Sequence, residues 1–157
     1  MIEIRLAKLD QILDLRWRVL RTGLPRQTAI FEGDEEPTTR HLAAVLDGRV
    51  VGCATLLRRP WMNQPAWQLR GMAVEPQYQR RGIGTLLLQA IERIVRAEPH
   101  SLQLWCNART PAIEFYRRHG WQCVGDEFVI PTAGPHYRMC KRLDAAEPLM
   151  HTQPSAR

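Results

Sequence analysis

The chain of 157 residues has the usual length of a single domain, and its 45% apolar content is ordinary for a soluble globular protein. Its formal net charge of +6 comes almost entirely from arginines scattered along the sequence, so charge alone is weak support for nucleic-acid binding. The apolar runs are shorter than the ~18 residues of a membrane span, and residues 1–10 show no secretory signal. These features exclude a membrane-spanning protein, and we expect a cytoplasmic one.

The predicted elements begin with a strand over residues 2–7, where apolar and polar residues alternate. A helix follows over residues 9–20, where apolar residues recur at helical spacing and Gly23 marks the stop. Residues 26–40 have no clear period and carry four acidic residues, which indicates a loop with room for one helical turn.

The next predicted feature is a β-hairpin over residues 41–60. Asp-Gly at positions 47 and 48 is flanked by apolar runs, and both residue types tolerate the positive φ that a tight turn needs. A further strand is predicted over residues 67–74. Gly71 lies inside this strand, where a glycine typically marks a bulge or a close approach of another backbone.

The second half of the chain predicts two helices and three strands. The first helix, over residues 81–97, has one continuous apolar face. The second begins at Thr110-Pro111, which are favourable cap and first-turn residues. The remaining predictions are an end of that helix at His119, strands over residues 101–107, 121–128 and 136–143, and a disordered tail over residues 144–157.

This order of elements, hairpins followed by β-α-β crossovers, predicts one domain over residues 1–143 of the α/β (α+β) class, with a mixed sheet and helices on both faces. The cysteines form neither a CxxC pair nor a Cys/His cluster, so we expect buried thiols rather than metal ligands or disulfides. They are Cys53, Cys106, Cys123 and Cys140. No metal is predicted.

Two glycines, Gly82 and Gly84, stand where the helix over residues 81–97 begins, although each weakens a helix by up to about 1 kcal/mol. They fit neither a P-loop, which needs Lys-Ser/Thr after its last glycine, nor a dinucleotide fingerprint, which needs a third glycine where this chain has Leu87. Free amides at a helix start bind anions, and glycines give an anion room to approach. The short motif supports such an anion site and an ordinary surface turn equally.

Two longer segments carry a family resemblance. VEPQYQRRGIGTLLL, residues 74–88, resembles the acetyl-CoA-binding motif of the GCN5-related N-acetyltransferase (GNAT) family, whose central pattern is Q/R-x-x-G-x-G/A. LQLWCNARTPAIEFYRRHGWQCVG, residues 102–125, is similar to a second motif of that family. The residues that match the second motif are Asn107, Ala112, Tyr116 and Gly120. The resemblance covers residues 47–124 well.

The resemblance implies a mostly antiparallel sheet with a splayed central strand pair, and transfer of an acetyl group from acetyl-CoA to a primary amine by direct attack in a ternary complex. The CoA pyrophosphate is expected on the amides of residues 80–85, and the pantetheine arm along strand 67–74, where a bulge at Gly71 opens a slot. A backbone N–H near Met72 or Ala73 would stabilise the developing oxyanion. The implied cofactor-binding residues are Met72, Ala73, Val74, Gln79, Arg80, Arg81, Gly82, Ile83, Gly84, Thr85 and Asn107.

The resemblance also implies that Tyr116 is the general acid that protonates the departing thiolate. Without it, the same tyrosine reads as an aromatic core contact of its helix. Asn107 would hold the pantetheine amide, or else it caps the loop that follows it.

The proton acceptor is the weakest part of the assignment. An aliphatic amine with a pKa of about 10.4 is mostly protonated at neutral pH, so some group must take its proton. Glu35 and His136 are candidates for the acceptor site; the plainer interpretations are a solvated acidic turn and a loop histidine. Glu75 is expected to face solvent. The sequence does not assign the base.

Two functions of different classes follow. The leading one is an N-acetyltransferase that acts on a small-molecule or peptide amine, without a metal, a nucleic acid or a membrane as partner. The alternative is a non-catalytic module with the same fold that binds nucleic acid or protein through its basic surface. The intact glycine turn and Tyr116 favour the enzyme. The identity of the acceptor and the presence of a homodimer stay open.

Overall fold

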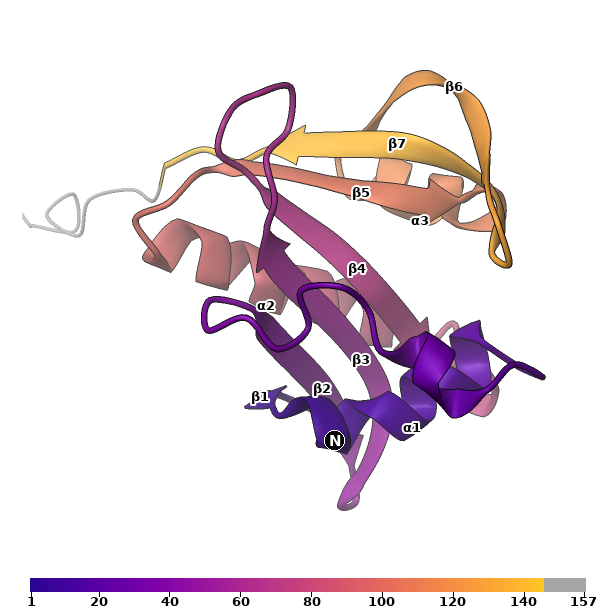
Figure 1. The fold of residues 1–157 in the computed structure, drawn as a ribbon. Helices are drawn as coiled ribbons and strands as arrows, with labels where there is room; N and C mark the ends of the chain where they lie inside the picture. The colour runs from indigo at the N-terminus through magenta and orange to yellow at the C-terminus, as the bar shows by residue number, and fades with distance from the viewer. Residues whose placement is uncertain (146–157) are drawn as a thin grey trace, which may run out of the picture.

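The computed structural model describes residues 1–145, and within them seven strands form one sheet (Figure 1). The strand order is β1-β2-β3-β4-β5-β7-β6, and every neighbouring pair is antiparallel except β4 and β5. The strands are β1 (Glu3–Ala7), β2 (Arg40–Leu46), β3 (Arg49–Arg58), β4 (Trp67–Val74), β5 (Gln103–Arg109), β6 (Gln122–Ile130) and β7 (Gly134–Arg142). This is the mixed, mostly antiparallel sheet that the sequence and the family resemblance predicted.

The helices cover both faces of the sheet, as predicted. They are α1 (Leu9–Leu20), α2 (Ile83–Ala97) and α3 (Ile113–Arg118), with short 3-10 turns η1 (Arg26–Ala29), η2 (Pro76–Tyr78) and η3 (Thr110–Ala112). Figure 1 shows α1 in front of the sheet and α2 behind it. Ile12 and Leu15 of α1 pack in one buried cluster, whereas Leu87 and Ile91 of α2 share a second cluster with Ile113 of α3. In the described part of the chain, no helix is long and apolar enough to cross a membrane.

Strand β4 carries the bulge that Gly71 predicted. Between Arg70, which is opposite Thr55, and Ala73, which is opposite Cys53, strand β4 has one residue more than β3. Gly71 itself takes a φ of +65°, a conformation that side chains with a Cβ rarely adopt.

The central parallel pair, β4 and β5, is splayed. Residues 67–69 of β4 pair with residues 104–106 of β5, and beyond them the ladder stops although both strands continue. Figure 1 shows the two strands diverging from that point. The bulge follows directly after the last residue of β4 that pairs with β5. The course of the backbone therefore separates the two strands in the middle of the sheet.

The predicted element boundaries differ from the structure at several ends. Helix α2 begins at Ile83 rather than at 81 because Gly82, its N-cap, has a φ of +81° and cannot be helical. Strand β5 begins two residues later than predicted, after a turn in which the Ser101 hydroxyl accepts the backbone N–H of Gln103. The predicted tail over residues 144–157 lies outside the described residues from 146 onward.

The cysteines have the environment that the sequence predicted. Cys53 and Cys106 are buried, Cys123 and Cys140 are partly buried, and all four are free thiols within strands. Within residues 1–145 no group of His, Cys, Asp or Glu is arranged to hold a metal ion.

Candidate active site

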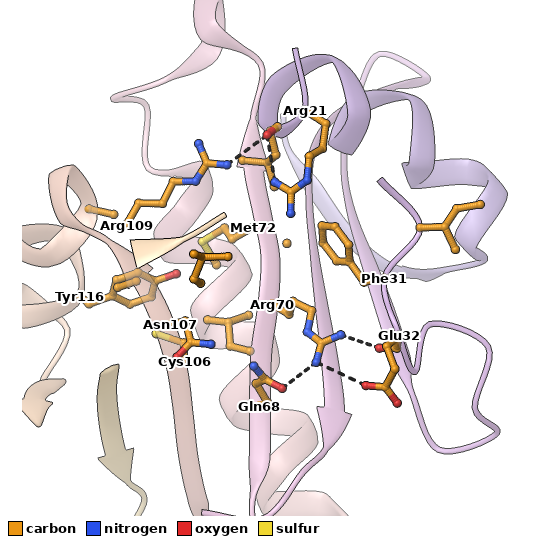
Figure 2. Close-up of a pocket in the computed structure, with 17 residues that line it drawn as sticks. Arg21, Phe31, Glu32, Gln68, Arg70, Met72, Cys106, Asn107, Arg109 and Tyr116 are labelled. Carbon is orange, nitrogen blue, oxygen red and sulfur yellow. Dashed lines mark hydrogen bonds and ion pairs between the residues drawn. The ribbon is translucent and has the colours of Figure 1, made fainter. Parts of the chain in front are cut away.

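A cleft of about 500 Å³ opens where β4 and β5 diverge. Its walls come from the end of α1, the loop after η1, the bulge of β4, the end of β5, helix α3 and strand β6. Figure 2 labels side chains around it from α3, β4, β5, the end of α1 and the loop after η1. Tyr116, Asn107 and Met72, which the sequence singled out and which lie on α3, β5 and β4, all line this cleft.

The start of α2 presents open backbone amides. Within the described residues, the first amide of this helix with a backbone acceptor is that of Leu86, which donates to the carbonyl of Gly82 at 3.0 Å. The two glycines serve different purposes. A Cβ at Gly82 would meet nothing within 4 Å, so the reason for a glycine at this position is its left-handed φ and not a lack of space. A Cβ at Gly84 would lie 2.9 Å from the ring of Phe115, so this glycine lets α2 pack against α3.

Some side chains around the start of α2 form hydrogen bonds within the protein, and others are exposed to solvent. Gln79 donates its side-chain amide to the carbonyl of Val74 at 3.1 Å, and the Thr85 hydroxyl lies 2.9 Å from Nε2 of His119. Both side chains therefore hold the turn in place. Arg80 and Arg81 are exposed, and Arg81 lies over the ring of Tyr78. What the loop offers to an anion is its backbone N–H groups and these two guanidiniums.

Beyond the splay, the edge of β4 that faces β5 has no ladder to that strand. Glu75 donates its N–H to the carbonyl of Val51 in β3, at 2.9 Å, so the backbone groups of the preceding residue, Val74, point the other way, toward β5. Across the slot, Asn107 sits inside β5 opposite Arg138 of β7 and does not cap a loop. Its Oδ1 is buried without a hydrogen-bond partner in the described structure. A buried acceptor of this kind fits a ligand that brings an N–H group.

Tyr116 lies on α3 and is 7% exposed, with its ring against Trp121 at a centroid distance of 5.2 Å. Burial raises its pKa well above the ordinary value, and the nearby Cys106 thiol adds to the rise. The phenol therefore keeps its proton throughout the neutral range. In Figure 2 the ring points from α3 into the cleft.

A buried ion pair fixes the opposite wall of the cleft. The Arg16 guanidinium of α1 is fully buried and binds Asp34 through two bonds, of 2.6 and 3.1 Å. It also donates to the hydroxyl of Thr55 and the carbonyl of Ala29. Asp34 in turn accepts the backbone N–H of Phe31 at 2.6 Å. This network holds the loop that carries Phe31 over the bulge of β4.

The charged side chains of the cleft are mostly arginines. Arg21 and Arg109 both donate to the carbonyl of Leu20, each at 3.0 Å, and thereby join the end of α1 to the end of β5. Arg70 donates to the carbonyl of Glu32 and to Gln68. Sequence reasoning missed this group because its members come from three distant segments, and no local pattern distinguishes them from the other scattered arginines.

The two residues proposed from sequence for the acceptor site do not line the cleft. Glu35 is exposed in the loop after η1, whereas Glu32 of the same acidic run reaches the cleft. His136 is buried between β5 and β6, with its Nδ1 2.7 Å from the carbonyl of Gly134. The acceptor-site roles of Glu35 and His136 therefore stay sequence predictions that this cleft does not support. An irregular loop and a strand end have no period from which the direction of a side chain can be read.

The expectation that Glu75 faces solvent is wrong. Its carboxylate is buried and accepts two hydrogen bonds from Arg18 of α1, at 3.0 and 2.9 Å. These bonds hold the pKa of Glu75 below its usual range, which makes it a poor proton acceptor. Its role is to fasten the end of β4 to α1.

Comparison with solved structures shows which class of protein shares this fold. Escherichia coli ElaA superposes with a TM-score of 0.77 at 19% identity, over 90% of this chain and 100% of that one. An aminoglycoside 6'-N-acetyltransferase complexed with coenzyme A superposes with a TM-score of 0.72 at 18% identity, over 93% and 99%. At these identities the structures establish a shared fold, that of the N-acetyltransferases.

Sequence comparison makes the assignment to a family. The model of the acetyltransferase (GNAT) family matches residues 7–121. The uncharacterized N-acetyltransferase YitI of Bacillus subtilis strain 168 is 29% identical over 146 residues, which are 91% of this chain and 97% of that protein. The chain belongs to the GNAT family, as its two motifs predicted.

Proposed function

We propose that this protein transfers an acetyl group from acetyl-CoA to a primary amine by direct attack of the amine in a ternary complex. The observation that carries the proposal is the slot between β4 and β5, whose wall holds the protonated phenol of Tyr116. Tyr116 belongs to α3, and the open start of α2 lies against that helix because Gly84 packs against Phe115 of α3.

The residues around the slot fit a CoA molecule. The backbone N–H groups of residues 80–85 would bind the pyrophosphate, with Arg81 at its edge, because a helix start attracts anions. The pantetheine arm would pair with the edge of β4 at Met72 and at the N–H of Val74, whose carbonyl already accepts the Gln79 side chain. The buried Oδ1 of Asn107, which has no partner in the described structure, would accept an amide N–H of that arm.

The chemistry needs a neutral amine and a proton for the leaving group. The amine nitrogen forms a bond to the acetyl carbonyl carbon, the carbon–sulfur bond breaks, and the departing thiolate takes a proton from Tyr116. The amine releases a proton, and one proton returns to the tyrosine through solvent, so charge balances. A backbone N–H near Met72 or Ala73 would stabilise the negative charge that develops on the carbonyl oxygen.

Acetyl-CoA is expected to raise the melting temperature. Ligand at a hundredfold its Kd stabilises a protein by about 2.7 kcal/mol, which for a domain of this size is a shift of about 5–10 °C. Differential scanning fluorimetry with acetyl-CoA, CoA and ATP at equal concentration measures it, and ATP controls for a general effect of anions. Absence of a shift with millimolar acetyl-CoA and CoA would refute the proposal.

Replacing Gly82 by alanine is expected to weaken acetyl-CoA binding about tenfold, because binding must then restore a left-handed conformation that costs alanine about 1–2 kcal/mol. Gly48 is a matched control, since it has a φ of +79° and equally open surroundings but lies in the β2–β3 turn. In denaturant titrations Gly82→Ala should lose no more stability than Gly48→Ala. Calorimetry should find the loss of affinity for Gly82→Ala alone; an equal loss for Gly48→Ala would contradict the assigned role.

A further inference from the structure

Two arginines meet at the cleft without a counter-charge. Arg21 follows α1 and Arg109 ends β5, and Figure 2 shows their guanidiniums joined by dashed lines to one oxygen. This oxygen is the carbonyl of Leu20. Each donates one hydrogen bond to this carbonyl, at 3.0 Å, whereas a guanidinium has five N–H donors. Within residues 1–145, neither is within ion-pair distance of a carboxylate: the ion pairs of that part of the chain involve other arginines and Lys141.

This arrangement has an electrostatic cost, which the ring of Phe31, 4.9 Å from the Arg21 guanidinium, and the carbonyl of Leu20 offset without any negative charge. Burial lowers the pKa of Arg21, and the like charges of Arg109 and Arg16 lower it further. Arg70, on the same cleft, also has a pKa lowered by its burial. The side-chain carboxylate among the lining residues belongs to Glu32, which is 73% exposed and ion-paired with Arg59. The cleft therefore carries a surplus of positive charge.

The end of α1 explains part of this geometry, because cations are favoured beside the last carbonyls of a helix. It does not explain why two guanidiniums share one carbonyl at the mouth of a cleft and keep their remaining donors free. CoA phosphates are an unsuitable counter-charge here. The amides proposed for them begin α2, which packs on the opposite face of the sheet from α1, and that loop has arginines of its own.

We infer that the acceptor is a small amine that also carries an oxyanion, a carboxylate or a phosphate, which Arg21 and Arg109 bind. The inference rests on the proposed acetyl transfer and names its substrate class. The same positive charges disfavour the ammonium form of a bound amine, so they lower its pKa and reduce the work left for a proton acceptor. This agrees with the cleft lining, which offers one exposed, ion-paired carboxylate as a base.

Matched pairs of amines test the inference. The panel contains amino acids with two to six carbons between the functional groups and their amides, aminoalkyl phosphates and the corresponding amino alcohols, and one polyamine. At saturating acetyl-CoA, release of free thiol gives kcat/KM for each. At least one anionic amine should exceed its neutral partner about ten- to hundredfold, the value of one charged hydrogen-bonded contact. The two arms distinguish carboxylate from phosphate, and the polyamine should be a poor substrate.

Variants connect the preference to the residues. Arg21→Gln and Arg109→Gln should each remove most of the anionic preference, whereas Arg21→Lys should restore part of it because the charge remains. Arg26→Gln is the control: Arg26 is exposed on η1, outside the cleft lining, and its loss changes net charge equally. The Kd of acetyl-CoA, measured by calorimetry, should stay within about twofold in all four variants, because the two arginines are proposed to bind the acceptor and not acetyl-CoA.

Four results would overturn the inference. Neutral partners could react as fast as anionic amines, or the polyamine could be the better substrate. Acetyl-CoA could bind while every anionic amine fails to react. Arg21→Gln could leave the preference intact and weaken acetyl-CoA instead, which would assign the guanidinium to the cofactor. Failure of acetyl-CoA to stabilise the unaltered protein is a separate result, because it removes the acetyl transfer on which the inference depends.

Discussion

Phenylalanine at position 116 is expected to lower kcat by about 10²–10⁴-fold, the usual contribution of a positioned proton donor. The acetyl-CoA Kd should change less than about twofold, because the ring and its packing against Trp121 remain and only the hydroxyl is lost. Pre-steady-state release of thiol with a good amine, together with calorimetric titration of acetyl-CoA, separates the two quantities. Equal turnover of the two proteins would remove Tyr116 from the mechanism.

The pH dependence gives a second readout for Tyr116. Burial raises its pKa well above the ordinary value, so the phenol keeps its proton through the mildly alkaline range. A loss of kcat between pH 8 and 10 therefore has a source other than ionisation of Tyr116. The same alkaline decrease of kcat should be seen in Tyr116→Phe. Tyr137→Phe is the matched control, since Tyr137 lies in β7 outside the cleft lining, and it should keep its kcat.

Replacing Asp34 by alanine is expected to cost about 3–5 kcal/mol of unfolding free energy, because it leaves the buried charge of Arg16 without its partner. The pair is almost completely buried, with side-chain exposures of 0% and 1%. The variant also releases the backbone N–H of Phe31, so the loop over the β4 bulge should loosen and the KM for the amine should rise. Urea unfolding followed by tryptophan fluorescence measures the first effect.

An exposed ion pair is the control for this loss. Arg117 and Glu114 on α3 lie 2.6 Å apart, but their side chains are 53% and 68% exposed. Water and salt weaken such a pair, so Glu114→Gln should cost less than about 1 kcal/mol. A comparable loss in the two variants would mean that the Arg16–Asp34 pair contributes no more than a surface contact.

Much of the fold could be read from residue order. Helix α1 and strand β4 have the predicted bounds because the apolar period in each is strong and the flanking residues are clear stops. Asp47-Gly48 predicted the turn between β2 and β3, and Gly71 predicted the bulge. These features depend on neighbouring residues in the chain, where the preferences of single residues suffice.

Other features needed the tertiary structure. Position 84 needs a glycine because a Cβ there would meet the ring of Phe115, which is distant in sequence. No local pattern predicts that contact. Glu75 was expected in solvent and is buried against Arg18, because the packing of α1 on the end of β4 decides its surroundings. Helix α2 begins where Gly82 turns left-handed, two residues after the place that apolar spacing suggested.

The candidate site divides in the same way. The sequence by itself determined the family, the glycine turn before α2 and the candidate proton donor Tyr116, because each belongs to a contiguous motif whose chemistry constrains neighbouring residues. Only the tertiary structure brought Arg21 and Arg109 to one carbonyl and excluded Glu35 and His136 from the cleft. The physical reason is that charge selection in a cleft depends on distances between segments that are far apart along the chain, and residue order does not contain these distances.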